Sequence, residues 1–198
     1  MARLEIQGGQ RLSGRVRAAG AKNSVIKLMA ASILFEAPIS LTNVPNLRDV
    51  QTMASLLEHM GATCVWNGSE GLSIAAGSLA ETQAPYHLVR TMRASFNVLG
   101  PLLARYGQAE VSLPGGCAIG TRPVDQHLAG LAALGASVAI ESGYVRASAE
   151  HGLVGTDFSF NFPSVGATEH LLMAAVLAKG QTRLSGCARE PEIVDLAA

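Results

Sequence analysis

The segment Ser24-Val-Ile-Lys-Leu-Met-Ala-Ala-Ser-Ile-Leu-Phe35 leads into Ile39-Ser-Leu-Thr42, so a continuous apolar helix pattern precedes a short strand pattern. This pair of patterns recurs twice further along the chain. The later copies occupy residues 94–105 with 110–113 and residues 167–178 with 182–185. Recurrence at a spacing of about 72 residues is typical of a fold built from repeated supersecondary units. The sequence therefore predicts three copies of one unit.

Each strand pattern is followed by an amphipathic helix, whose apolar residues recur at helical spacing. In the first unit this stripe consists of Val50, Met53, Leu57 and Met60. In the second unit it consists of Val124, Leu128, Leu131 and Leu134, after Pro123 at the first helical position. The second helix of a unit should therefore bury one face and leave the other polar.

Both of these helices end in a Gly-Ala pair, at Gly61 and Gly135, where glycine can adopt the left-handed conformation that closes a helix. Two strands follow each pair. They are predicted at residues 63–66 and 72–74, and at residues 137–140 and 144–147. The unit is therefore helix–strand–helix–strand–strand, which places the protein in the α/β class.

The first helix of each unit is apolar on nearly all sides and should be buried, whereas the second should lie outside and cover the sheets. Three such units can close around their own inner helices. The third unit is incomplete, because residues 191–198 match only the start of an outer helix. An open sheet edge would then face water, so we expect this chain to be part of a longer protein.

The composition limits the possible partners. The chain has 198 residues, of which 48% are hydrophobic, and its 15 basic residues balance its 15 acidic ones. That balance provides no long-range field to hold nucleic acid or an anionic membrane. No apolar run has the length of a signal peptide or a membrane span, and three cysteines in unlike settings suit a reducing compartment. We expect a cytoplasmic protein that binds small molecules.

Alignment of the repeats places Lys22, Arg93 and Gly166 at the starts of the three inner helices. A cation there is unfavourable, because the N-terminus of a helix already carries partial positive charge. A bound phosphate or carboxylate would reverse that effect by sharing backbone amides with the basic side chains. The alternative is that both cations extend into solvent. Neither a P-loop nor a Gly-x-Gly-x-x-Gly dinucleotide motif is present.

The segment Pro114-Gly-Gly-Cys-Ala-Ile-Gly-Thr-Arg-Pro123 predicts a glycine-rich surface loop that exposes Cys117. Arg122 follows closely, and a nearby cation favours the reactive thiolate. The alternative is that Cys117 is a small buried hydrophobe, the usual state of a free cysteine. That state suits Cys64, inside a strand pattern, and Cys187, in a turn.

The five histidines are dispersed, and no two have the spacing of metal ligands. We therefore expect no metal and no cofactor. His127 and His170 fall on predicted helices, where we expect surface or supporting positions.

Five motifs together resemble the family of UDP-N-acetylglucosamine enolpyruvyl transferases, in order and over the whole chain. They are Ala21-Lys-Asn23, Thr91-Met-Arg-Ala-Ser95, residues 112–125 around Cys117, Pro163-Ser-Val-Gly-Ala-Thr168 and Arg189-Glu-Pro-Glu-Ile-Val-Asp195. The resemblance implies that residues 22–198 form one lobe of an inside-out α/β barrel, whose inner helices point at a cleft between two lobes. It also implies that residues 1–21 form strands that pack in a second lobe, which would be the partner of this one.

The resemblance implies transfer of the enolpyruvyl group of phosphoenolpyruvate to the 3-hydroxyl of UDP-N-acetylglucosamine, with release of phosphate. This is the first committed step of peptidoglycan precursor synthesis. Cys117 matches the family's proton donor and fosfomycin target. Lys22, Asn23 and Arg122 match its residues for phosphoenolpyruvate. The residues that match contacts to UDP-N-acetylglucosamine are Arg93, Arg122, Pro123, Val124, Asp125, Gln126, Ser164, Val165 and Gly166.

Two departures from the family pattern limit what this chain should do. Phe162 stands where some relatives carry lysine, which leaves one contact to the uridine side open. The family's catalytic aspartate and a further arginine for phosphoenolpyruvate belong to the second lobe, so this chain alone should be inactive. Two alternatives remain: a non-catalytic lobe that binds a sugar nucleotide or phosphate, and a lobe of the sister family, 5-enolpyruvylshikimate-3-phosphate synthase. The sister family lacks the loop around Cys117.

Overall fold

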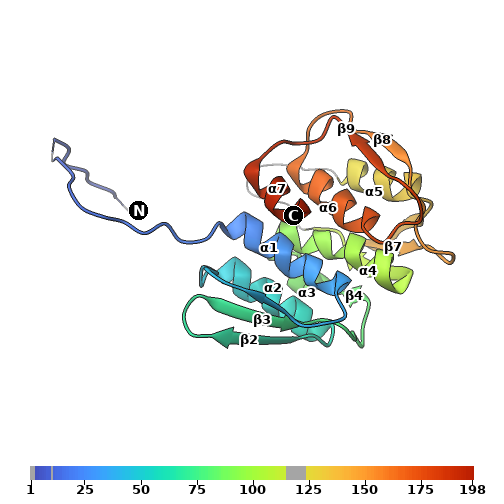
Figure 1. Ribbon diagram of the computed structural model, residues 1–198, viewed down its shortest axis with the longest axis horizontal. Coiled ribbons are helices and arrows are strands. Elements are labelled where there is room, and N and C mark those ends of the chain that lie inside the picture. Colours follow the sequence, from blue (N-terminus) through green and yellow to red (C-terminus); the bar gives the residue numbers. More distant parts are fainter. Residues whose placement is uncertain (1–2, 10, 115–123) are drawn as a thin grey trace.

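The computed structural model describes residues 3–9, 11–114 and 124–198, and it arranges them as helices and small sheets around shared inner helices (Figure 1). The first unit comprises α1 (Lys22–Ala31), the 3-10 helix η1 (Ser32–Leu34), β1 (Ile39–Leu41), α2 (Arg48–His59), β2 (Thr63–Asn67) and β3 (Gly71–Ala75). This order is the predicted helix–strand–helix–strand–strand.

The later units repeat that order, and each begins with an additional strand. The second comprises β4 (Gln83–Ala84), α3 (Tyr86–Val89), the 3-10 helix η2 (Arg93–Val98), α4 (Leu99–Tyr106), β5 (Gln108–Ser112), α5 (Asp125–Ala133), β6 (Ser137–Glu141) and β7 (Tyr144–Ser148). The third comprises β8 (Asp157–Ser159), α6 (Val165–Ala175), β9 (Arg183–Ser185) and α7 (Pro191–Ala197).

The sheets explain why an additional strand precedes each later inner helix. The strand orders are β1-β3-β2, β4-β5-β7-β6 and β8-β9. β4 pairs with β5 in parallel, as β8 does with β9, whereas the other pairs are antiparallel. Parallel neighbours need a crossover connection. The inner helices α4 and α6 provide it, so both helices are held against the sheets at both ends.

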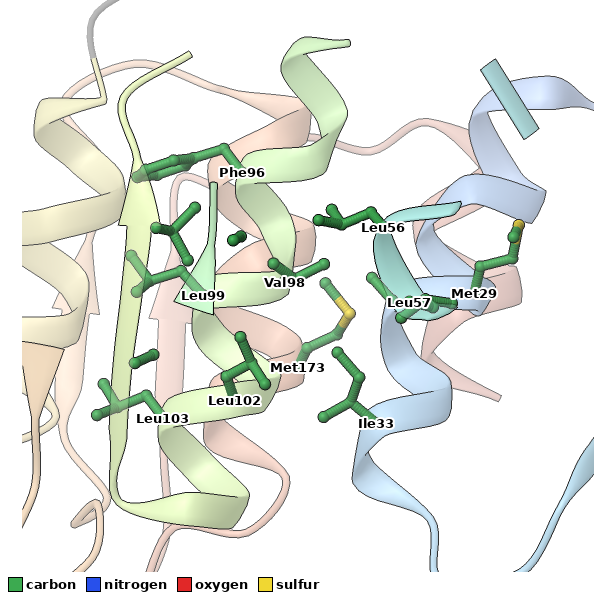
Figure 2. Packing of buried hydrophobic residues seen from close by; sticks show 14 of the residues in the cluster. Met29, Ile33, Leu56, Leu57, Phe96, Val98, Leu99, Leu102, Leu103 and Met173 are labelled. Atoms are coloured by element: carbon green, nitrogen blue, oxygen red, sulfur yellow. The ribbon is translucent and has the colours of Figure 1, made fainter. Parts of the chain in front are cut away.

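The inner helices supply the centre of one continuous core (Figure 2). Met29 of α1, Leu102 of α4 and Met173 of α6 are almost fully buried. The predicted stripe of α2 is also buried, since Val50, Met53, Leu57 and Met60 each expose 0% of their surface. Gly61 and Gly135 have φ values of 103° and 91°, which confirms the left-handed ends of both outer helices.

The inner segment predicted at residues 94–105 is not one helix. It begins as the 3-10 helix η2, and the α-helix starts only at Leu99. The cause is Pro101, which has no amide hydrogen and cannot sit inside an α-helix without breaking a hydrogen bond. Starting α4 at Leu99 places Pro101 in the first turn, where the amide needs no intrahelical partner.

The strands that the resemblance implies within residues 1–21 would pair in a second lobe, so they stay a prediction. The described part of this segment before α1, residues 3–9 and 11–21, contains no helix or strand and extends away from the body of the protein (Figure 1). Leu4, Ile6, Leu12 and Val16 are 80% to 97% exposed. A strand needs a backbone partner, and no described strand pairs with this segment.

A substitution at Gly100 tests how closely α4 packs against α6. An added Cβ on this α4 residue would lie 2.8 Å from the carbonyl oxygen of His170 on α6. Backbone cannot move aside as a flexible side chain can, so Gly100→Ala should lower the free energy of unfolding by about 1–3 kcal/mol. Urea denaturation measures this change, and Gly8→Ala, which has open space, is the control. Equal destabilisation of both variants would contradict the close contact.

Candidate functional site

A pocket of about 660 Å³ lies where the three inner helices begin. It is lined by the starts of α1, η2 and α6 and by the residues that lead into α5. Every described residue that the sequence analysis assigned to substrate lines it: Lys22, Asn23, Arg93, Val124, Asp125, Gln126, Ser164, Val165 and Gly166. Phe162 lines it as well. Cys117, Arg122 and Pro123 lie outside the described residues.

The start of α1 places a cation at the pocket. Lys22 is the first residue of α1, and its Nζ lies 2.5 Å from Oδ2 of Asp49, in the first turn of α2. Asp49 is favourable there because it faces the positive end of its own helix. The pair is about 40% exposed, and an exposed ion pair contributes little to stability. An incoming anion can therefore compete with Asp49 for Lys22.

The start of α6 provides amide groups. Ser164 is the N-cap, and its hydroxyl accepts a hydrogen bond from the backbone N–H of Ala167 at 3.4 Å. The amides of Val165 and Gly166, at the first two positions of the helix, have no intrahelical acceptor. Because these amides lie at the positive end of the helix dipole, the site suits an anion.

Gln126 holds the loop that leads to α6. Its Nε2 donates to the carbonyl oxygen of Phe162 at 3.2 Å, and its Oε1 accepts from the amide of Asn161 at 2.8 Å. The side chain is 4% exposed. Its amide oxygen and one amide N–H are therefore used within the protein, where they hold the loop before α6.

The structure brings together four buried ionisable residues that the sequence analysis did not connect. Lys27 of α1 forms a hydrogen bond and ion pair with Glu169 of α6, and Nδ1 of His127 lies 3.0 Å from Nδ1 of His170. His127 and His170 expose 6% and 0% of their surfaces, which excludes surface positions and leaves the supporting positions that were the other alternative. Only the lysine in an otherwise apolar helix pattern was a signal in the sequence.

Burial shifts the pKa values of the two histidines and of Glu169. It lowers the pKa of His127 to about 3, with the charges of Arg93 and Lys27 adding to the effect. It lowers the pKa of His170 well below its ordinary value, assisted by His127 and Lys27. Burial also raises the pKa of the Glu169 carboxyl, although Lys27 opposes that shift. Both imidazoles are therefore neutral at pH 7.

The two described cysteines are poor nucleophiles. Burial, followed by the charge of Glu58, raises the pKa of Cys64 to about 11, and burial also raises the pKa of Cys187. Because the thiolate is the reactive form, both cysteines should be inert at neutral pH. Neither belongs to the described lining of the pocket.

The family model of EPSP synthase (3-phosphoshikimate 1-carboxyvinyltransferase) matches residues 6–198. The chain belongs to this family. Within the EPSP synthase family, the chain is 58% identical over 198 residues to the UDP-N-acetylglucosamine 1-carboxyvinyltransferase of Hyphomonas neptunium, and 55% identical over 197 residues to that of Acinetobacter baylyi. It is covered completely in both comparisons. These matches confirm the resemblance that the motifs predicted.

The chain spans about half the length of these relatives, 46% and 47% respectively. Solved structures agree in fold. The enolpyruvyl transferase NikO from Streptomyces tendae superposes with a TM-score of 0.80 at 23% identity, over 96% of this chain and 44% of its own. An EPSP synthase from Acinetobacter baumannii gives a TM-score of 0.70 at 15% identity, over 91% and 42%. The fold of this EPSP synthase family member is thus a mixed α/β domain that matches part of an enolpyruvyl transferase.

No described helix is both long and apolar enough to cross a bilayer. Within residues 3–9, 11–114 and 124–198, no group of three or more His, Cys, Asp or Glu side chains is arranged to hold a metal ion.

Proposed function

We propose that this chain forms the anion-binding lobe of an enzyme that transfers the enolpyruvyl group of phosphoenolpyruvate to the 3-hydroxyl of UDP-N-acetylglucosamine. One observation carries the proposal: three helix starts, from segments far apart in the sequence, line a single pocket. Both substrates are anions, and both can use amides and cations at helix starts. The relatives matched at 51–58% identity also carry the name of this activity.

The proposed reaction adds a proton to C3 of phosphoenolpyruvate and the oxygen of the sugar 3-hydroxyl to C2, while the hydroxyl proton passes to a base among the residues that would complete the active site. The tetrahedral intermediate then loses a proton from C3 and phosphate from C2, which restores the C2–C3 double bond. Lys22 and Arg122 would bind the phosphate and carboxylate of phosphoenolpyruvate and stabilise charge that develops during the addition. Asn23, next to Lys22 on α1, would lie at the junction of the two substrates. The start of α6 would bind the diphosphate of the sugar nucleotide, with Arg93 and residues 122–126 completing its contacts.

Cys117 would supply the proton to C3. The described thiols support this assignment by contrast, since burial makes Cys64 and Cys187 unreactive and neither joins the pocket lining. The relatives are about twice as long as this chain, so we propose that their further residues complete the active site. The chain by itself should bind UDP-N-acetylglucosamine without turning it over.

Protection of Cys117 tests the proposal. Iodoacetamide should alkylate Cys117 of the intact chain, and saturating UDP-N-acetylglucosamine should slow that reaction severalfold, as followed by mass spectrometry of peptides. Cys64 and Cys187 serve as internal controls that should stay largely unmodified with or without the ligand. Protection by shikimate 3-phosphate instead would point to a synthase of the shikimate type. No protection by either compound would contradict the proposed substrate.

A further inference from the structure

The histidine pair on α5 and α6 adds a function to the pocket that the family resemblance does not assign. His127 lines the pocket, and His170 lies directly behind it with no exposed surface. The ring centroids are 4.9 Å apart, and Phe96 packs against both rings at 5.5 Å and 5.9 Å. This packing surrounds both rings with buried side chains, and the two Nδ1 atoms face each other within it.

The hydrogen bond allows two proton arrangements. Each neutral imidazole carries one proton, on Nδ1 or on Nε2. Because the two Nδ1 atoms face each other at 3.0 Å, one Nδ1 must donate and the other must accept. The ring that accepts then carries its proton on Nε2. Whichever ring donates through Nδ1 therefore determines the tautomer of its neighbour.

The surroundings of the two Nε2 atoms differ, and this difference selects one arrangement. Nε2 of His170 is buried and has no hydrogen-bond partner among the described residues. It lies beside Gly100, where an added Cβ would be 3.0 Å away. A buried N–H group without an acceptor is rare in proteins, and an unprotonated Nε2 avoids one here. His170 should therefore leave Nε2 unprotonated and donate its single proton through Nδ1.

His127 then carries its proton on Nε2, at the pocket. An added Cβ on Gly166 would lie 3.7 Å from this atom, which places it beside the first turn of α6. The described hydrogen bonds of His127 use only Nδ1. An N–H group here would add a donor beside the amides of Val165 and Gly166, at a helix start that suits an anion.

We propose that His170 is a positioning residue that holds His127 in the Nε2–H tautomer, and that His127 thereby donates a neutral hydrogen bond to a diphosphate bound at the start of α6. The identity of the diphosphate rests on the proposed function, whereas the tautomer rests on the geometry of the pair alone. A neutral donor suits a site that already contains Lys22 and Arg93, because it binds the anion without adding a third charge. It also keeps its proton throughout the neutral pH range.

Nitrogen-15 NMR of the histidine rings tests the tautomer without any ligand. In the intact chain at pH 7, His127 should show a protonated Nε2 and an unprotonated Nδ1, and His170 the reverse. His170→Leu removes the donor and should convert His127 to a mixture of both tautomers. A proton on Nδ1 of His127 in the wild-type chain would overturn the proposal.

A matched pair of substitutions tests the donor. The amide nitrogen of glutamine can reach the position of Nε2, whereas that of asparagine reaches only the position of Nδ1. His127→Gln should therefore bind UDP nearly as well as the wild-type chain. His127→Asn should bind about tenfold more weakly, the scale of one lost hydrogen bond to a charged group.

Calorimetric titration with UDP separates this proposal from the proposed function. Equal affinities of the two variants and the wild-type chain would overturn the role of His127 while leaving the proposed function intact. Failure of the wild-type chain to bind UDP would instead contradict the proposed function, and the ring nitrogens would still decide the tautomer. Circular dichroism of both variants shows whether a loss of binding comes from a loss of fold.

Discussion

Replacing Lys27 by methionine is expected to lower the free energy of unfolding by about 3–5 kcal/mol, the usual cost of breaking a buried ion pair from one side. Lys27 and Glu169 join two inner helices, and their side chains are 9% and 0% exposed. Oε1 of Glu169 has no further partner among the described residues. Without Lys27, the carboxylate would be left buried with no compensating charge.

The stability lost in the Lys27→Met variant should depend on pH, because the Glu169 carboxyl gains or loses its proton. Burial raises the pKa of this carboxyl and Lys27 opposes the shift, so its pKa should rise further in the Lys27→Met variant. A raised carboxyl pKa means that the native state keeps a proton that the unfolded chain has lost. Stability of the variant should therefore fall as pH rises from about 4.5 through the raised pKa, a steeper fall than in the wild-type chain.

The double variant Lys27→Met with Glu169→Leu is the control. Replacing both partners of a buried ion pair by apolar residues is often neutral or stabilising. The second substitution should therefore recover most of the stability that the first one removes, as measured by urea denaturation at pH 7. A single variant as stable as the wild-type chain, or a double variant no better than the single one, would show that the pair does not hold α1 and α6 together.

Lowering the pH from 7 to 4 is expected to remove about 3 kcal/mol of stability through His127 alone. The pKa of this imidazole falls from 6.5 to about 3 on folding, because burial disfavours its charged form. Between those values the unfolded chain binds a proton that the native protein does not. Stability from His127 is thus fully present above pH 6.5 and is lost as pH falls toward 3. His170 acts in the same direction.

Lowering the pH should reduce stability through His127 but increase it through Glu169. The two contributions must therefore be measured separately. Glu169 is unchanged in a His127→Gln variant, so the difference between wild-type and variant stability reports the histidine pair, in which His127 also contributes to the lowered pKa of His170. That difference should change by about 3 kcal/mol between pH 4 and pH 7. Parallel stability curves for the two proteins, from urea denaturation at several pH values, would contradict the buried neutral imidazole.

Some features of the candidate site could be predicted residue by residue. Lys22, Arg93 and Gly166 were placed at helix starts by the repeat alone, and the structure places all three at one pocket. Asp49, the partner of Lys22, could not be predicted, because an acidic residue in the first turn of a helix is favourable wherever the helix lies. Gln126 lines the pocket, and the sequence does not reveal that its side chain also holds the loop before α6.

The break in the second inner helix could have been predicted and was not. Pro101 lies inside the apolar segment 94–105, and a proline cannot occupy the interior of an α-helix without loss of a hydrogen bond. The strands expected in residues 1–21 came from the family resemblance rather than from a local pattern. The described part of that segment contains no strand, and the implied pairing in a second lobe stays a prediction.

The sequence by itself determined the repeating order of helices and strands, the buried stripe of α2 and the glycines that end α2 and α5. These features depend on local periodicity and backbone conformation, which neighbouring residues set. Only the tertiary structure decided which side chains meet. Lys27 and Glu169 are 142 positions apart and His127 and His170 are 43 apart. Their contacts depend on how the helices pack against one another, and no local pattern contains that information.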